Sequence, residues 1–257
     1  MDHSEYPTEQ HTGERAILAS RWISRPVENL LDAGCDDGNN ASLLSKKARH
    51  AWGIDINKKS IELAQRTYPL ISFSSCPVET TPFGNNFFDV IVMNDVLEHV
   101  RNEPIALNEM FRILKKGGQL IISTPHKGVF AFMDPANIKF LIKNKTLRRL
   151  IYGKKKADKF IADKNFGESF HRHYTLKQLC HILEQSSFNG QYDIEHVYRS
   201  GLVLGVFSVD LKILLKRFIG NKIATLILTP LFKLASLEYW IPFGPFAYNI
   251  SIAVRKI

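Results

Sequence analysis

Short apolar runs alternate with amphipathic stretches through most of this chain. Apolar residues that recur at helical spacing predict helices, and short continuous apolar runs predict strands buried on both faces. The predicted strands cover residues 28–33, 50–57, 71–74, 88–93, 120–122, 192–197 and 248–254. The predicted helices cover residues 13–25, 40–47, 60–65, 104–115 and 176–185. Strands that alternate with helices indicate right-handed βαβ units, so the pattern predicts an α/β fold with a doubly wound, mostly parallel sheet.

Several element ends carry their own sequence signals. Pro26 closes the first predicted helix, Pro104 opens the fourth and Gly117 follows it, and Thr175 is the expected N-cap of the last. The length of 257 residues suits one domain, and we expect a single domain over 1–257 with two insertions, at about 127–170 and 202–246.

The first insertion, residues 127–170, is strongly basic. It holds eleven Lys and Arg against four Asp and Glu, which is most of the formal charge of +9 that the whole chain carries. A basic lid of this kind suits an acidic partner, such as a nucleic acid, phospholipid headgroups or a phosphorylated substrate. The alternative is a solvated face with no partner.

The second insertion, residues 202–246, is rich in Leu, Ile and Phe with lysines interspersed. Asp210, Pro230 and Lys233 interrupt it, so no stretch reaches the roughly 18 apolar residues of a membrane span. Two amphipathic helices are expected here. Four roles remain open: they lie on a membrane surface, line a tunnel for an apolar substrate, cover a face of the sheet, or form a dimer interface.

A glycine turn follows the first predicted strand. Gly34 and Gly38 allow a sharp turn into the next helix, an arrangement that directs backbone N–H groups beyond the end of the strand. The second strand ends at Asp55, one helix and one strand later, where a carboxylate can accept the hydroxyls of a ribose. Asp32, Asp55, Asn94 and Pro125 all fall at carboxyl ends of strands, so the two features together predict a nucleoside site.

These motifs resemble those of the class I S-adenosylmethionine-dependent methyltransferases of the type 11 group. The segments that carry the resemblance occur in the order of that family and lie at 31–38, 53–55, 81–91, 95–100 and 114–125. The resemblance covers residues 28 to 126 and implies a Rossmann-like sheet of seven strands whose last two form an antiparallel pair. It also implies S-adenosylmethionine as the cofactor.

The cofactor-binding residues that the resemblance implies come from the strand ends and the loops after them. They are Asp32, Gly34, Cys35, Asp36, Gly38, Asp55, Ile56, Val78, Glu79 and Asn94. Two positions depart from the family pattern. Asp36 stands where a glycine is usual, and Pro77 stands where an aspartate often holds the adenine amino group.

Two histidines are the candidate catalytic bases. His99 follows the fourth strand and His126 the fifth, and an imidazole there can take the proton of an oxygen nucleophile. Each has a capping or supporting role as its alternative. His171 and His173 are weaker candidates. Asp95, Glu98 and His99 also resemble the acidic metal site of some methyltransferases, but we expect no metal.

The sequence favours an S-adenosylmethionine-dependent enzyme that methylates an oxygen of a small or lipid-linked acceptor, such as a quinone precursor or a glycolipid. The alternatives are an RNA methyltransferase that uses the basic lid, with nucleic acid the weaker partner, and a cofactor-binding scaffold without catalysis. Three unpaired cysteines and a polar start without a signal peptide predict a cytoplasmic location. Peripheral contact with the inner membrane surface is the second expectation.

Overall fold

The computed structural model describes the chain except for residues 1–11, 135–170 and 203. Most of the basic insertion predicted at 127–170 therefore lies outside the described residues. The described residues fall into two compact units. One comprises His11–Thr124, Tyr174–Tyr198 and Ile250–Ile257 and is called the sheet unit here. The described parts of the other, the insertion unit, are 125–134, 171–173 and 199–249 without residue 203.

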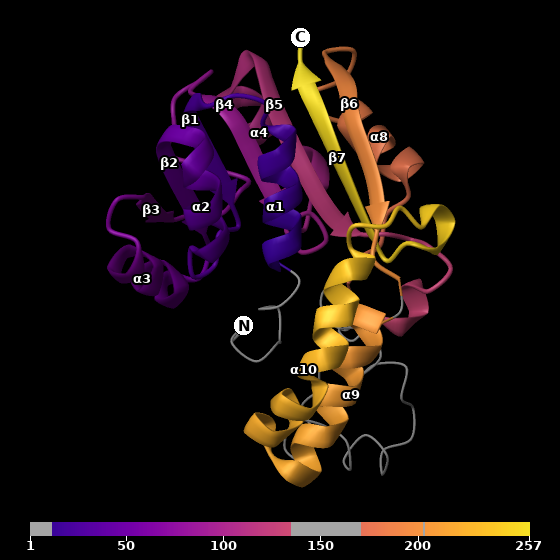
Figure 1. The fold of residues 1–257 in the computed structure, drawn as a ribbon. Coiled ribbons are helices and arrows are strands. Elements are labelled where there is room, and N and C mark those ends of the chain that lie inside the picture. The colour runs from indigo at the N-terminus through magenta and orange to yellow at the C-terminus, as the bar shows by residue number, and fades with distance from the viewer. Residues whose placement is uncertain (1–11, 135–170, 203) are drawn as a thin grey trace. The chain divides into compact units, whose positions relative to one another are not determined.

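A seven-stranded sheet organises the molecule, with the strand order β3-β2-β1-β4-β5-β7-β6. The strands are β1 (Val27–Ala33), β2 (Ala48–Asp55), β3 (Ser72–Ser75), β4 (Phe88–Asn94), β5 (Leu114–Pro125), β6 (Tyr192–Ser200) and β7 (Asn249–Lys256). The pairs among β1 to β5 are parallel. The arrow of β7 runs opposite to those of β5 and β6 (Figure 1), so the sheet is mixed, and the predicted α/β fold with an antiparallel closing pair is confirmed.

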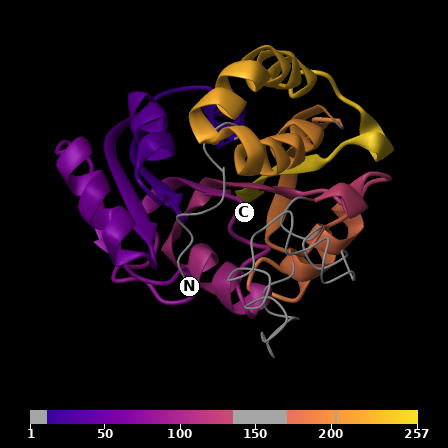
Figure 2. The ribbon, with the colours of Figure 1, turned by 90° about the horizontal axis from the view of Figure 1, so that it is seen from below.

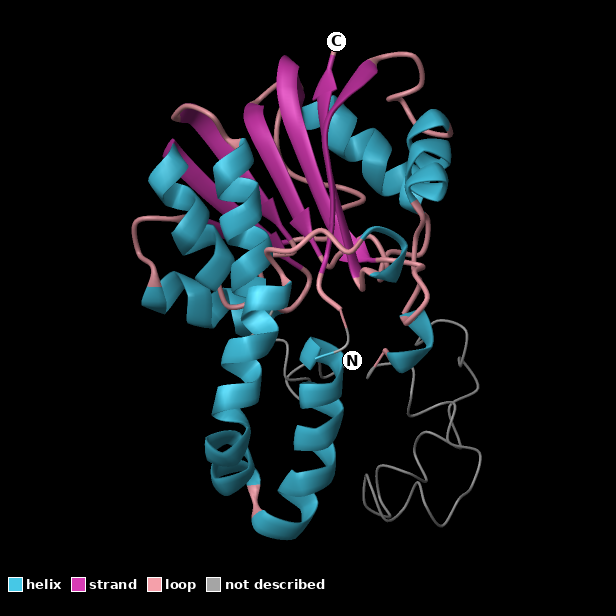
Figure 3. Cartoon of the chain, turned by 45° about the vertical axis from the view of Figure 1, so that its right-hand side comes forward, coloured by secondary structure: helices cyan, strands magenta, loops and turns pink. Residues whose placement is uncertain are grey.

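Helices cover both faces of the sheet in the sheet unit (Figure 3). On one face, α4 (Glu103–Ile113) and α8 (Leu176–Glu184) bury their apolar stripes against Ile91, Met93 and Ile252. On the other, α1 (Thr12–Trp22) and α2 (Asn39–Leu44) pack on Leu30 and Val92. α3 (Lys58–Thr67) packs beside β3 in a smaller cluster with Phe73. Burial on both faces explains why the central strands are almost entirely apolar.

Local sequence signals set several element ends. Thr175 caps α8 in a capping box with Gln178, as the sequence predicted, and the side chain of Asn57 accepts from the first turn of α3. One predicted end was wrong. α4 ends at Ile113 and β5 begins at Leu114, because Leu114 already takes an extended conformation and pairs with Phe88. Gly117 thus lies within a strand at a positive φ of 73°, next to an irregular register, and does not terminate a helix.

Smaller boundary differences affect the first two helices. α1 ends at Trp22, three residues before the predicted end, and α2 gives way at Ser45–Lys47 to the 3₁₀ turn η2. Neither difference moves the strand ends, which carry the candidate site.

Within the insertion unit, α9 (Leu204–Ile219) and α10 (Asn221–Glu238) lie side by side (Figures 1 and 2), which confirms the two helices predicted for 202–246. Short 3₁₀ turns, η3 (Ala131–Met133) and η4 (Gly244–Phe246), belong to the same unit. No helix in the described part of the chain combines the length and apolar content needed to span a membrane.

Candidate functional site

The glycine turn joins β1 to α2 in the conformation that the sequence predicted. Gly34, Asp36 and Gly38 have φ angles of 84°, 43° and 85°, all in the left-handed region. A Cβ at Gly34 would collide with the side chain of Val96, so this position also requires a residue without one. Asp36 takes the place of a glycine because aspartate tolerates left-handed backbone better than most residues.

Several N–H groups of this turn bind within the protein, which corrects the prediction for those groups that they are directed at a ligand. Gly34 and Cys35 both donate to the carbonyl of Ile54, at 2.7 and 2.9 Å. Gly38 donates to the carbonyl of Cys35 at 2.9 Å. These bonds hold the turn against the end of β2, so its N–H groups position the surrounding side chains.

Asp55, the last residue of β2, links the two loops beside it. Its Oδ2 accepts from the N–H of Asp36 at 3.1 Å, and its Oδ1 accepts from the N–H of Asn57 at 2.8 Å. The half-buried carboxylate is thereby held next to the glycine turn. A carboxylate oxygen can accept more than one hydrogen bond, which is the chemistry that the hydroxyls of a sugar require.

Two buried polar side chains lie at the ends of neighbouring strands without an internal partner. Asp32 is 1% exposed and Asn94 is 6% exposed. Among the described residues, neither the oxygens of Asp32 nor the amide of Asn94 has a hydrogen-bond partner. They lie on adjacent parallel strands, where Asp32 pairs in register with Val92, two residues before Asn94. Because buried polar groups are nearly always hydrogen-bonded, this pair indicates a polar ligand.

The site is acidic. Burial and, to a smaller extent, the nearby charge of Asp55 together raise the pKa of Asp32 to about 7. Burial, together with the charges of Asp32, Asp55 and Asp36, also raises the pKa of the Cys35 thiol well above its usual range, so that thiol stays protonated. Such a concentration of carboxylates repels the pyrophosphate of a dinucleotide and attracts a cationic group.

The loop after β3 borders this site and is anchored at both ends. The N–H of Cys76 donates to the carbonyl of Asp55 at 3.1 Å, and Thr81 donates to the carboxylate of Glu109 from its N–H and its hydroxyl. Val78 is buried and Glu79 is partly exposed on this loop. Ile56 follows Asp55 with 71% of its side chain exposed, an apolar surface suited to the face of an adenine.

Arg15 of α1 is a site residue that the sequence analysis missed. It is 6% exposed and forms an ion pair with Asp95, which follows β4 with a φ of 55°. The only signal in the sequence is a basic residue inside an amphipathic helix, a pattern that most often marks a solvated position. Its partner lies 80 positions away along the chain, so the pair becomes visible only in the folded structure.

The segment after β4 separates the residues of the alternative metal pattern. Glu98 is buried and accepts from the hydroxyl of Thr124 at 3.0 Å, whereas the side chain of His99 is exposed. Asp95, Glu98 and His99 do not form a metal site, and no group of His, Cys, Asp and Glu within the described parts of the chain could hold a metal ion.

His126 belongs to the insertion unit and is held in one chemical state. Its Nδ1 lies 3.0 Å from the carbonyl of Ala247, so Nδ1 carries the proton and donates. Burial lowers the pKa of this imidazole, and the charges of Arg199 and His173 lower it further. The ring is therefore neutral at neutral pH with Nε2 unprotonated, the state that a general base requires.

A buried carboxylate in the same unit binds the two weaker histidine candidates. Oδ2 of Asp134 lies 3.3 Å from Nδ1 of His171 and 3.1 Å from Nε2 of His173. Asp134 is 1% exposed. These contacts give His171 and His173 a structural role, because they join the residues after the undescribed segment to Asp134, which precedes it.

Comparison with known proteins identifies the region that carries the site. Residues 31–122 match the family model described as a methyltransferase domain. A probable S-adenosylmethionine-dependent methyltransferase of Mycolicibacterium smegmatis is 31% identical over 114 residues, which cover 44% of this chain and 43% of that protein. The malonyl-[acyl-carrier protein] O-methyltransferase of Erwinia billingiae is 27% identical over 119 residues, covering 45% and 47%.

A solved structure extends the likeness beyond this region. The S-adenosylmethionine-dependent methyltransferase of Mesorhizobium loti has a TM-score of 0.55 at 17% identity, covering 94% of this chain and 97% of that one. The chain spans less than half the length of the two curated relatives described above. Residues 31–122 thus match a methyltransferase domain, and the sheet that contains them has the fold of a solved S-adenosylmethionine-dependent methyltransferase.

Proposed function

We propose that this chain is an S-adenosylmethionine-dependent methyltransferase. The observation that carries the proposal is the pair of buried, unpartnered side chains of Asp32 and Asn94 beside Asp55. A ligand with an amino acid group and a sugar would supply hydrogen-bond partners for Asp32 and Asn94 and hydroxyls for Asp55. The acidic surroundings favour a cationic sulfonium on that ligand. The match of residues 31–122 to the methyltransferase domain supports the same cofactor.

The residues of the sheet unit would bind and orient this cofactor. Asp32 and Asn94 would hold its amino acid part, Asp55 its ribose, and Ile56 with the loop at Val78 and Glu79 its adenine. The bound cofactor supplies an activated methyl group, so the protein has to align the acceptor and exclude water. His126 is the preferred base for an oxygen acceptor, because its Nε2 is unprotonated.

For the acceptor, we propose an oxygen of a small or lipid-linked amphiphile. The Erwinia relative is named as an O-methyltransferase, which supports oxygen as the atom methylated. The basic segment 127–170 and the apolar helices α9 and α10 support an acceptor with both an anionic and an apolar part.

Cofactor binding is tested first, by calorimetry with S-adenosylhomocysteine on the purified full chain. We expect binding to weaken at least about tenfold in Asp55→Ala, because the variant loses a charged hydrogen-bond partner. Asp193→Ala, which removes an exposed carboxylate of β6, is the matched control. A folded protein that does not bind the compound would overturn the proposal in favour of a scaffold without this cofactor.

The acceptor is tested with S-adenosylmethionine labelled in its methyl group. The enzyme is incubated with a lipid extract, a water-soluble extract or RNA, and the label is followed into each fraction. We expect transfer into lipid that depends on Asp55. Label that is released by ribonuclease would instead establish the RNA alternative, and transfer to water-soluble compounds alone would exclude the lipid-linked class.

A further inference from the structure

The two helices of the insertion unit form a hairpin with a small core of its own. The hairpin, residues 204–238, turns at Gly220, and the buried side chains of Leu228 and Phe232 on α10 pack against Leu211 and Leu215 of α9. Nζ of Lys212 lies 5.6 Å from the centre of the Phe232 ring. These contacts use one face of each helix.

The opposite face of α10 is also apolar. The exposed fractions are 54% for Ile223, 75% for Leu226, 56% for Ile227, 51% for Leu234 and 60% for Leu237. Leu226 and Ile227 lie three and four positions after Ile223, and Leu234 and Leu237 lie seven and ten positions after Ile227, so the five residues line one side of the helix. Ala224, Leu228, Phe232 and Ala235 form the buried side. A helix that only covered its neighbour would present polar residues outward, and α10 does not.

α9 repeats this arrangement with a narrower stripe. Phe207, Leu214 and Phe218 are 46%, 38% and 63% exposed. Their spacings of seven and four place them on one side of α9. Phe218 lies two residues before Gly220, and Ile223 lies three residues after it, so both stripes reach the turn of the hairpin.

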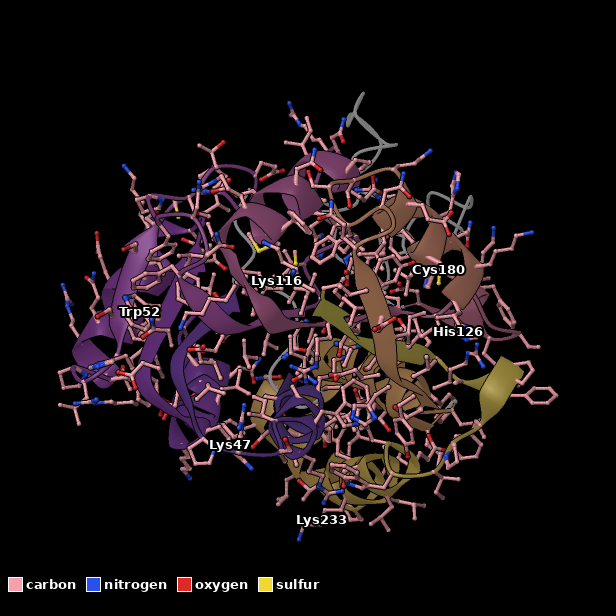
Figure 4. The ribbon with its side chains drawn as sticks, turned by 90° about the horizontal axis from the view of Figure 1, so that it is seen from above. Lys47, Trp52, Lys116, His126, Cys180 and Lys233 are labelled. Carbon is pink, nitrogen blue, oxygen red and sulfur yellow. The ribbon has the colours of Figure 1, made fainter. Side chains whose placement is uncertain are left out.

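The charges beside these stripes have one sign. Every exposed charged side chain that the structure describes in the hairpin is a lysine, and Lys222 and Lys233 border the apolar stripe of α10. Figure 4 shows Lys233 at the outer side of its helix. Glu238 is buried and accepts from the N–H groups of Leu202 and Leu204, so its charge does not balance the lysines at the surface.

We propose that the hairpin docks on an anionic lipid bilayer, with its exposed apolar stripes in the interfacial region and its lysines at the headgroup phosphates. An apolar face bordered by cations is the arrangement that such a surface recognises. A second copy of the hairpin is the poorer occupant, because the exposed charges that it would bring to the interface are also lysines. The proposal is independent of the methyltransferase activity.

The experiment is co-sedimentation of the purified full chain with vesicles, without cofactor. One set of vesicles is phosphatidylcholine, and the other is an equal mixture of phosphatidylcholine and phosphatidylglycerol. Phe218→Ser combined with Leu226→Ser removes apolar surface from both helices, and Leu63→Ser with Leu70→Ser, two exposed leucines of the sheet unit, is its control. Lys222→Glu combined with Lys233→Glu reverses two charges of the hairpin. Lys46→Glu combined with Lys116→Glu, which reverses two exposed charges of the sheet unit, is its control.

We expect the wild type to bind the mixed vesicles and to bind phosphatidylcholine vesicles at least about tenfold more weakly. Both hairpin variants should lose a comparable factor in affinity for the mixed vesicles, and neither control variant should. All the exchanged residues are exposed, so the variants should fold, which circular dichroism verifies. Equal binding to both vesicles, or equal losses in hairpin and control variants, would overturn the proposal. The proposal would also fail if the hairpin mediated self-association and no vesicle binding. Light scattering would then show a molecular mass that rises with protein concentration in the wild type and is lower in the serine variant.

Discussion

Burial at the end of β1, together with the nearby charge of Asp55, raises the pKa of Asp32 to about 7. In the unfolded chain this carboxyl ionises near pH 4. The folded chain therefore binds an extra proton between about pH 4 and about pH 7, and its stability falls as the pH rises through that window. Three pKa units correspond to about 4 kcal/mol, an upper estimate for a group that relaxes or hydrates when it ionises.

We expect Asp32→Asn to remove this loss, so that the variant without ligand unfolds at a higher temperature than the wild type at pH 8 and at a similar one at pH 5. Thermal unfolding at the two pH values measures the difference. Asp89→Asn, which changes a carboxyl that has Lys115 and the N–H of Asn29 as partners, is the control. A wild-type pH dependence that persists in Asp32→Asn would contradict the assignment.

The same residue makes cofactor binding depend on pH. A cationic ligand beside Asp32 favours its ionised form, so binding should release a proton below about pH 7 and tighten as the pH rises from 6 to 8. Calorimetry with S-adenosylmethionine in buffers of different ionisation enthalpy counts that proton. Asp32→Asn should bind at least about tenfold more weakly and release none. An affinity that does not change between pH 6 and 8 would speak against Asp32 as a ligand.

The two histidine candidates differ in state, and this leads to a prediction about the catalytic base. His126 is buried, with its pKa lowered and its Nε2 unprotonated, whereas His99 is exposed. We expect His126→Gln to lower kcat by about 100-fold and His99→Gln to have little effect. In the wild type, kcat should fall only at pH values below the usual pKa of a histidine, because burial lowers the pKa of His126. A larger effect of His99→Gln would reverse the assignment.

At the scale of elements, the junction of β1 and α2 depends on close packing as well as on backbone conformation. Gly34 combines a φ of 84° with contact to Val96, so Gly34→Ala meets both strain and a collision. We expect a loss of at least about 2 kcal/mol in the free energy of unfolding, measured in urea. Gly190 has a φ of 67° and open space around it, so Gly190→Ala should lower the free energy of unfolding by only about half as much. Equal losses would show that packing against Val96 contributes nothing.

At the scale of the whole molecule, the insertion unit depends on a buried ion cluster. Burial alone would raise the pKa of Asp134, but hydrogen bonds and charge interactions with His171 and His173 outweigh it and hold the pKa well below its usual range. The stabilisation is therefore fully present above about pH 4, where the unfolded carboxyl is ionised, and is lost as the pH falls further. His171 and His173, which follow the undescribed segment 135–170, thus stabilise the carboxylate of Asp134, which precedes it.

We expect Asp134→Asn to lower the free energy of unfolding at pH 7 by about 1–3 kcal/mol, since each histidine loses a charged partner. The difference from the wild type should shrink between pH 4 and pH 2, followed by circular dichroism during thermal unfolding. Asp193→Asn, which changes an exposed carboxyl of β6, is the control and should behave as the wild type does. A difference that is constant over this range would exclude the ion cluster as its cause.

The predictions that held rest on local sequence signals. Apolar runs buried on both faces located the strands, and Thr175 located the start of α8, because these signals act within a few residues. The end of α4 was mispredicted, since the pairing of Leu114 with Phe88 extends β5 to a position where the local pattern still favours a helix. Arg15 was missed for the same reason, because its partner Asp95 is distant in sequence.

By itself, the sequence determined the order of strands and helices, the glycine turn and the acidic strand ends, because periodicity and backbone freedom are properties of neighbouring residues. Only the tertiary structure decided which polar groups at those ends lack partners, where the N–H groups of the turn bind, and which face of α10 stays exposed. Each of these depends on residues from different elements meeting in space. The unpartnered side chains of Asp32 and Asn94 and the exposed stripe of the hairpin are both products of that meeting.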